Sequence, residues 1–189
     1  KFYANGALLP PYLMQMVLMV TWTMTPYATA CDSKGDRPAL RALLLNGTRG
    51  SLFLAAAIGS GLLFTGNAFL HQWINPALLD SQDYANAGVI LMLLTWATLV
   101  RASSSCGRQV LFGMRRMRLL AGLSSSEAIL NVSLSILLIQ QIGTEGVAYG
   151  TLIPIILFYG IGQNLYLART LSIPIVTFLG QVVRASVPV

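Results

Sequence analysis

A chain of 189 residues in which 55% are apolar and only 10% are charged does not have the composition of a soluble domain, where about 25% of residues are charged. The net charge of +6 would suit nucleic-acid binding only if a soluble domain carried a basic face. The arginines instead lie at the ends of long apolar runs, so we expect no nucleic-acid partner.

The apolar runs follow one another along the whole chain. Each has the length of about 20 residues that a helix needs to cross a hydrocarbon layer of about 30 Å. We therefore predict an all-α fold: a polytopic bundle of transmembrane helices with five spans and the start of a sixth. The predicted spans cover about residues 8–30, 51–73, 85–103, 119–139 and 147–168, and the sixth begins near residue 173.

The connection after the first span contains an amphipathic segment. The sequence DRPALRALLLNG predicts a short helix on the inner membrane face at about residues 36–47. Asp36 can cap this helix, Pro38 suits its first turn, and its leucines recur at helical spacing. We expect Arg37 and Arg41 to point toward lipid headgroups.

Lysine and arginine alternate strictly between successive connections. Residues 31–50 carry four of them, residues 74–84 carry none, residues 101–118 carry five, and residues 140–146 carry none. Arg169 follows the fifth span. The positive-inside rule then puts the basic connections in the cytoplasm and the first residues of the chain outside.

Polar side chains follow one face of the fourth span. Glu127 and Asn131 lie one helical turn apart, and Glu127 is nine residues past Arg118, roughly 13 Å along a helix. A carboxylate this deep in a membrane tends to face a bundle interior or a polar cavity. Arg101, at the cytoplasmic end of the third span, can pair with Glu127, but snorkelling to the inner interface is the favoured expectation. We take Glu127, Asn131 and Arg101 as substrate-pathway candidates, while hydrogen bonding that only holds the bundle together is an equal alternative for Asn131.

Two prolines lie inside predicted spans. Pro26 cannot donate to the carbonyl of Trp22, and Pro154 leaves the carbonyl of Gly150 without its helical partner. Gly146 and Gly150 form a small-xxx-small pair that allows close helix contact. We take Pro26 and Pro154 as candidate helix hinges, which suit a transporter with alternating access, although prolines also bend helices in static bundles.

The titratable residues form no recognisable catalytic or metal-binding pattern. The chain has one histidine, two isolated cysteines and six acidic residues that are spread over separate segments. It has no glycine-rich phosphate loop followed by lysine. We expect a protein that is not an enzyme and that needs neither a metal nor a cofactor.

A longer string of residues runs through the fourth and fifth spans. It consists of Val110-Leu111-Phe112-Gly113-Met114, Glu127-Ala128, Asn131, Leu134-Ser135, Gly143, Gly146-Val147-Ala148, Gly150-Thr151 and Pro154. This string resembles the signature of the C-terminal lobe of polysaccharide flippases. These proteins are the lipid-linked oligosaccharide exporters of the multidrug/oligosaccharidyl-lipid/polysaccharide exporter superfamily, and the resemblance extends loosely over nearly the whole chain.

The resemblance implies a two-lobe transporter with a central cavity. Residues 1–189 would then be a partial C-terminal transmembrane lobe, with the missing N-terminal lobe as a partner from the same protein. The implied activity is to move a polyprenyl-pyrophosphate-linked oligosaccharide across the bacterial cytoplasmic (inner) membrane for the biosynthesis of polysaccharide such as lipopolysaccharide. The implied partners are the lipid-linked glycan and membrane lipid.

The resemblance also gives the basic connection a role. Arg108, Arg115, Arg116 and Arg118 would contact the lipid headgroup or the pyrophosphate at the entry side. The alternative is that these arginines only set the topology. For the whole chain, the alternatives are a cation-coupled multidrug exporter of the same superfamily, a membrane scaffold without transport activity, and an integral membrane transferase.

Overall fold

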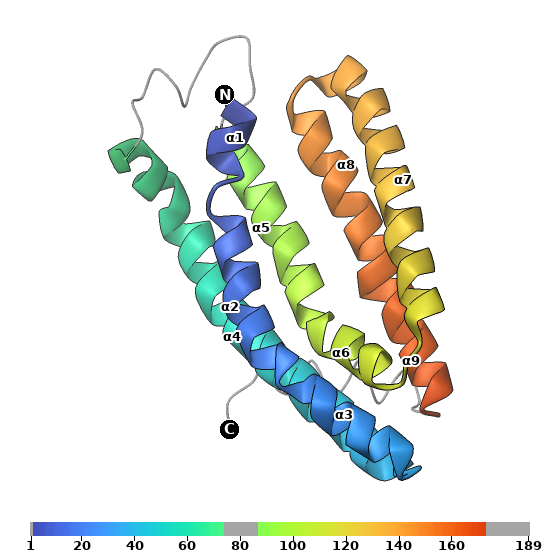
Figure 1. Cartoon of the computed structure of the whole chain (residues 1–189). Coiled ribbons are helices and arrows are strands. Elements are labelled where there is room, and N and C mark those ends of the chain that lie inside the picture. Colours follow the sequence, from blue (N-terminus) through green and yellow to red (C-terminus); the bar gives the residue numbers. More distant parts are fainter. Residues whose placement is uncertain (1, 74–86, 173–189) are drawn as a thin grey trace.

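The fold is a bundle of long helices (Figure 1). The structure, a computed structural model, describes residues 2–73 and 87–172, and within these ranges the regular elements are helices without a strand. The predicted all-α bundle is confirmed, and its length and composition are those of a multi-pass membrane protein. The sixth span predicted near residue 173 and the connection at residues 74–84 lie outside the described residues. Five described segments are long and apolar enough to cross a membrane: Tyr3–Ser33, Arg37–Gly66, Ala87–Gly113, Met117–Ile142 and Glu145–Thr170.

The first span is broken into three helices, α1 (Phe2–Gly6), α2 (Pro10–Trp22) and α3 (Met24–Ser33). A proline fits the first turn of a helix because its missing N–H would have no helical acceptor there, and α2 begins at Pro10. The helix ends at Trp22, whose carbonyl Pro26 cannot bond. The break between α2 and α3 therefore lies one turn before Pro26.

The second span corrects the prediction of a separate inner-face helix. α4 runs without interruption from Arg37 to Trp73, so residues 36–47 are the start of the span itself. The predicted cap is present, because Asp36 Oδ1 accepts the N–H of Ala39 at 3.0 Å. The apolar face of this segment is covered by protein, and Leu40 and Leu44 are fully buried. Since that face has a protein partner, the segment extends the span.

The arginines at the start of α4 bind another helix end. Arg37 Nη1 donates to the carbonyl of Thr170 at 3.3 Å, and Arg41 Nε donates to the carbonyl of Leu171 at 2.5 Å. These carbonyls end α9 (Asn164–Thr170), where a cation also complements the helix dipole. The expectation that Arg37 and Arg41 reach lipid headgroups is thus replaced by a contact within the protein.

The third span is longer than predicted. α5 (Ala87–Ser103) and α6 (Ser105–Gly113) are separated only at Ser104, and together they form a helical span of 27 residues. Most of the predicted cytoplasmic loop is therefore helical, because α6 buries a face against α3 and α4. Arg101 consequently lies inside this span and not at its end.

The fourth and fifth spans form a tight hairpin (Figure 1). α7 (Met117–Ile142) turns at Gly143, whose φ is +67°, into α8 (Glu145–Ile155), which continues as the π-helix η2 (Ile156–Gln163) and then as α9. A Cβ atom on Gly146 would lie 2.5 Å from the carbonyl carbon of Leu138, and one on Gly150 would lie 2.8 Å from the Cα of Ser135. The small residues therefore allow the helix contact that their spacing predicts.

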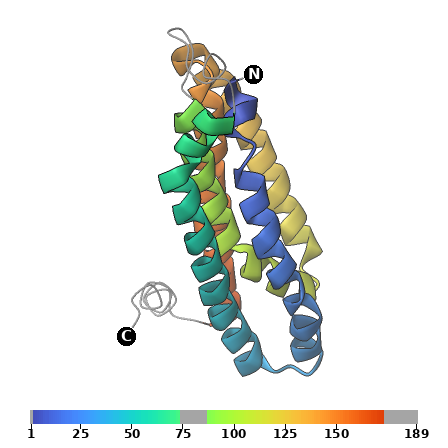
Figure 2. The ribbon, with the colours of Figure 1, turned by 90° about the vertical axis from the view of Figure 1, so that its left-hand side faces the viewer.

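The largest apolar cluster fills the space between α3, the start of α4, α6 and α9. We call it the α6 cluster. Figure 2 shows that the connection of α3 to α4 lies at the end of the bundle away from the N-terminus. The buried residues of the cluster are Ala28, Cys31, Leu40, Leu44, Cys106, Val110, Leu111, Met114, Leu120, Leu167 and Leu171.

Candidate functional site

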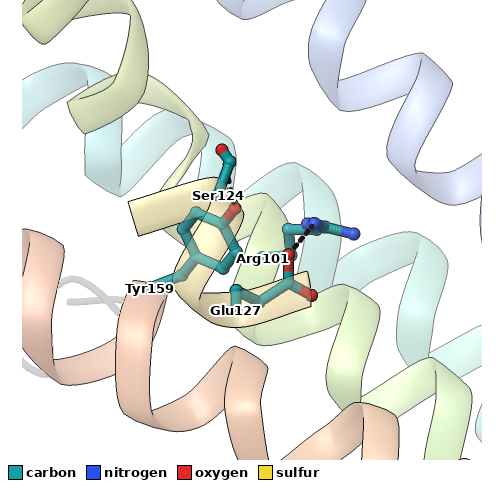
Figure 3. Close-up of polar contacts among 4 residues, drawn as sticks. All are labelled: Arg101, Ser124, Glu127 and Tyr159. Carbon is teal, nitrogen blue, oxygen red and sulfur yellow. Dashed lines mark hydrogen bonds and ion pairs between the residues drawn. The ribbon is translucent and has the colours of Figure 1, made fainter. Parts of the chain in front are cut away.

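An ion pair joins α7 to α5 inside the bundle. Most of α7 is exposed on the surface of the chain, yet Glu127 is only 8% exposed. Its Oε2 lies 3.3 Å from Nη2 of Arg101. Figure 3 shows the two side chains pointing toward each other. The favoured expectation for Arg101, snorkelling to the inner interface, is therefore not what the structure shows. Arg101 lies within the span and keeps 35% of its side chain exposed, while it supplies the counter-charge that the buried carboxylate needs.

Tyr159 lies beside this ion pair and connects it with a second arginine. The side chain comes from η2, is 2% exposed, and its hydroxyl lies 3.4 Å from Oγ of Ser124 (Figure 3). Its ring centroid is 5.1 Å from Cζ of Arg101 and 4.7 Å from Cζ of Arg108. Both distances are within the range of about 6 Å at which a guanidinium is attracted to an aromatic ring.

The position of Tyr159 depends on two matched helix irregularities. Pro154 has no N–H for the helical ladder, and the π-helix begins two residues later. The hydroxyl of Ser104, at the break between α5 and α6, donates to the carbonyl of Tyr159 at 3.0 Å. In return, Nε2 of Gln163 donates to the carbonyl of Ser104 at 2.7 Å. Each irregular segment thus satisfies polar groups of the other, as a membrane interior requires.

The predicted basic cluster is divided by the fold. Arg108 lies on α6 inside the bundle, whereas Arg115, Arg116 and Arg118 are exposed at the turn into α7 and in its first turn. Nη2 of Arg108 is buried and has no hydrogen-bond partner among the residues that the structure describes. An unpaired buried donor costs about 1–3 kcal/mol, and more when it is charged. Only Arg108 of these four therefore belongs to the interior site.

Two cavities border the arginines. A cavity of about 250 Å³ lies between α6 and α7, and a larger one of about 430 Å³ lies among α1, α2, α5 and α8. Arg101 contributes the charged side chain of the larger cavity, whose other lining residues are apolar or neutral. The smaller cavity is lined by Arg108, Phe112, Met117, Leu120, Ala121 and Ser124.

Asn131 takes no part in this arrangement. Its Oδ1 accepts the hydroxyl of Ser135 at 3.3 Å, one turn further along α7. The polar side chains along α7 therefore make three different contacts. Ser124 meets Tyr159, Glu127 pairs with Arg101, and Asn131 bonds within its own helix. Because this bond stays within α7, the structure shows Asn131 neither in the site nor in a contact between helices.

Sequence reasoning missed Tyr159. A tyrosine inside an apolar run has no special spacing, and the aromatic belts of membrane proteins make an interfacial position the ordinary expectation. One signal was available, because Tyr159, Gln163 and Asn164 place three polar groups on adjacent turns just after Pro154. Polar groups that follow a proline within a span mark a helix that needs partners from another helix.

The chemistry that the assembled site offers is the binding of charge. One guanidinium is paired with a carboxylate, a second has a buried donor available, and both contact the same aromatic ring. Within the described ranges, no group of three histidine, cysteine or acidic residues could hold a metal ion.

Comparison of the chain with protein-family models, with curated proteins and with solved structures finds no match. The resemblance to polysaccharide flippases therefore rests on the residues of this sequence.

Proposed function

We propose that this chain is part of one lobe of a membrane transporter that moves a polyprenyl-pyrophosphate-linked oligosaccharide across the bacterial cytoplasmic membrane for polysaccharide biosynthesis. The observation that carries the proposal is the pair of guanidinium groups, Arg101 and Arg108, inside a helical span and on one aromatic ring. The resemblance of residues 110–154 to the flippase signature supports the same activity.

An anionic headgroup is the part of such a substrate that a membrane resists most. Its transfer needs cationic partners within the bundle, and guanidinium groups bind phosphate oxygens with two parallel hydrogen bonds. The cavity beside Arg101, at about 430 Å³, falls within the range of about 300–1,000 Å³ that is typical of small-molecule sites. In the proposed transporter, a second lobe completes the space for the glycan.

A cation-coupled drug exporter of the same superfamily is the alternative function. Such a transporter needs a carboxylate that can exchange a proton or a metal cation with its surroundings. Glu127 is the buried carboxylate of α7, and its Oε2 already binds Arg101. An internal cation therefore occupies the group that coupling would use, and the geometry favours an anionic substrate.

Transport in proteoliposomes tests this proposal. The complete two-lobe protein would be reconstituted with a fluorescent lipid-linked pyrophosphate oligosaccharide, and the outer-leaflet fraction measured by membrane-impermeant quenching. We expect Arg108→Gln to slow transport about tenfold, the effect of losing about 1.4 kcal/mol of charge-assisted bonding. Arg118→Gln, which alters an exposed arginine on the same side, is the matched control and should transport at the unaltered rate.

Two further measurements separate the alternatives. The 189-residue chain alone should insert into the membrane without transporting the substrate, because alternating access needs two lobes. Movement of a lipophilic cationic dye by the complete protein, without movement of the glycan lipid, would contradict the proposal and favour the drug exporter.

A further inference from the structure

The buried apolar side chains fall into separate clusters, and the division between two of these cores lies at one level of the bundle. The α6 cluster is the core at one end of the described chain. The core next to it consists of Leu13, Val17, Ala55, Ala97, Ala102, Ile155 and Tyr159. The two cores leave a gap in each of four spans, at residues 18–27, 45–54, 103–105 and 160–166.

Buried polar residues gather in these four gaps. Of the nine buried polar or charged residues that the structure describes, six lie there, and we call them the polar layer: Thr21, Thr48, Ser51, Ser104, Ser105 and Gln163. A hydroxyl group in a helix can bond to a carbonyl of the preceding turn, which satisfies it without another helix. Thr21, Ser51 and Ser105 do so. Half of the polar layer is thus satisfied inside its own helices, so these bonds survive a movement of one span against another.

Each of the four spans also has a helix irregularity or a weak point at this level. Sharp helix bends occur at prolines, at glycine–serine pairs and at π-helical turns. The first span breaks at Thr23, and the second stays helical but passes the layer at Gly50 and Ser51. The third span breaks at Ser104, and the fifth forms the π-helix η2. Places at which four spans can bend together allow one end of the bundle to tilt as a unit.

Contacts between the spans hold these irregularities side by side. The sulfur of Cys106, two residues after the break in the third span, lies 3.5 Å from that of Met24, which begins α3. The carbonyl of Ser104 accepts the side-chain N–H of Gln163 at 2.7 Å and the backbone N–H of Arg108 at 3.2 Å. Figure 1 shows α3, α6 and α9 together at one end of the bundle, beyond these contacts. The four bends therefore share one level in space.

We propose that α3, residues 37–47 of α4, α6 and α9 form one rigid unit, the α6 block, which tilts against the rest of the chain at the polar layer. A hinge needs only a few residues at the ends of elements to absorb the change in backbone angles, and the four bends supply them. The rest of the chain includes α7, which contributes the buried Leu120 to the α6 cluster but packs mainly on α8.

The tilt changes the smaller of the two cavities. That cavity, of about 250 Å³, is lined by residues of α6 on one side and of α7 on the other. Since α6 belongs to the α6 block and α7 does not, tilting the block widens or closes the cavity. The tilt goes beyond the proposed function, because it concerns how the chain moves whatever it carries, and its test measures distances without transport.

Distances between spin labels, measured by double electron–electron resonance on the chain in lipid nanodiscs, test the tilt. Both native cysteines are first changed to alanine. Labels on Ser33→Cys and Arg169→Cys report the α6 block, and labels on Phe64→Cys and Ile136→Cys report the rest, all at exposed positions. A tilt of about 15°, the size of a known rotation between protein subunits, moves the far end of α3 by about 4 Å, because its 10 residues span about 15 Å.

The expected result is a contrast between two kinds of pair. Ser33 with Arg169, and Phe64 with Ile136, lie within one unit and should give narrow distance distributions. Ser33 with Ile136, and Arg169 with Phe64, lie across the polar layer and should give distributions that are broader or split by about 4 Å. Equal widths for all pairs would overturn the proposal, because the chain would then be either one rigid body or loose throughout.

Gln163→Met tests whether the polar layer controls the tilt. The change removes the bond from η2 to the break in the third span, while the Ser104 carbonyl keeps the N–H of Arg108. We expect the distributions across the layer to widen further and those within each unit to stay unchanged. Thr95→Val, at a fully buried polar residue outside the layer, is the matched control and should leave all pairs as they are. If Gln163→Met has no effect across the layer, or widens the pairs within each unit equally, the polar layer is not the hinge.

Discussion

α6 and α7 are consecutive in the chain and differ sharply in how they are held. Seven of the nine residues of α6 are buried, and they contact α3, α4 and the last helix. Of the 26 residues of α7, only Leu120 and Glu127 are buried. α6 is thus held by apolar packing on several sides, whereas α7 is held by its hairpin with α8 and by the polar contacts of Glu127 and Ser124.

This difference indicates which part of the molecule can move. A segment with few buried apolar contacts shifts at a lower free-energy cost than one that is packed on all sides. α7 carries the carboxylate that pairs with Arg101, while α6 carries Arg108, whose buried Nη2 has no hydrogen-bond partner among the described residues. A displacement of α7 therefore changes the ion pair, while it reaches the α6 cluster mainly through Leu120.

A cavity in the α6 cluster should have the largest effect. Leu111 is fully buried, and we expect Leu111→Ala to lower the free energy of unfolding by about 2 kcal/mol, the low end of the range for such changes. The low end applies because lipid removes much of the hydrophobic term. Unfolding in sodium dodecyl sulfate followed by circular dichroism measures it. Ile136→Ala, at an exposed position on α7, is the matched control and should cost little. Equal costs would show that α7 is as tightly packed as α6.

Overpacking at the hairpin contact should lower stability by a comparable amount. A side chain at Gly146 meets the backbone of α7 at Leu138, so Gly146→Val should lower the free energy of unfolding by about 1–3 kcal/mol through overpacking. The same unfolding assay measures the change. Gly122→Val on α7 has no atom within 4 Å of its added Cβ and serves as the control. A large loss at Gly122 with none at Gly146 would mean that α7 is held by a face other than the hairpin.

The ion pair should contribute less than the hairpin contact to the free energy of unfolding. Glu127→Leu leaves Arg101 without its carboxylate, and we expect a loss of about 1–2 kcal/mol in the unfolding assay because a polar contact in a membrane bundle is removed. Glu127→Gln keeps a hydrogen-bond acceptor and should preserve expression and most of the stability, while it lowers transport by the complete protein. If Glu127→Gln transports normally, Glu127 acts only in packing.

The cap of α4 should have the smallest effect. Asp36→Ala removes the acceptor of the Ala39 N–H and should lower the free energy of unfolding by about 1 kcal/mol, whereas Asp36→Asn keeps an acceptor and should change it little. The unfolding assay compares the two. Because the cap begins the helix that buries Leu40 and Leu44, the loss should come from the α6 cluster. Equal losses for both variants would show that charge matters more than the cap bond.

The sequence predicted the elements better than their connections. Apolar runs of sufficient length predict membrane-crossing helices wherever the chain folds, so the five spans are present at nearly the expected residues. The sequence pattern predicts that the segment at residues 36–47 and the one after Ser103 lie outside the spans. Both are amphipathic, and an amphipathic pattern does not tell whether lipid or protein covers the apolar face. Here the two segments cover each other in the α6 cluster.

The sequence alone predicts that Glu127 is buried in the bundle, because exposing a carboxylate to lipid costs several kcal/mol. Its partner, the separation of Arg108 from the other arginines, and the role of Tyr159 were decided only by the tertiary structure. The contacts of Arg101 join residues that are far apart in the chain. Glu127 lies 26 positions after Arg101, and Tyr159 lies 58 positions after it. Local spacing fixes which side of a helix a residue occupies, and only the packing of helices fixes what that side meets.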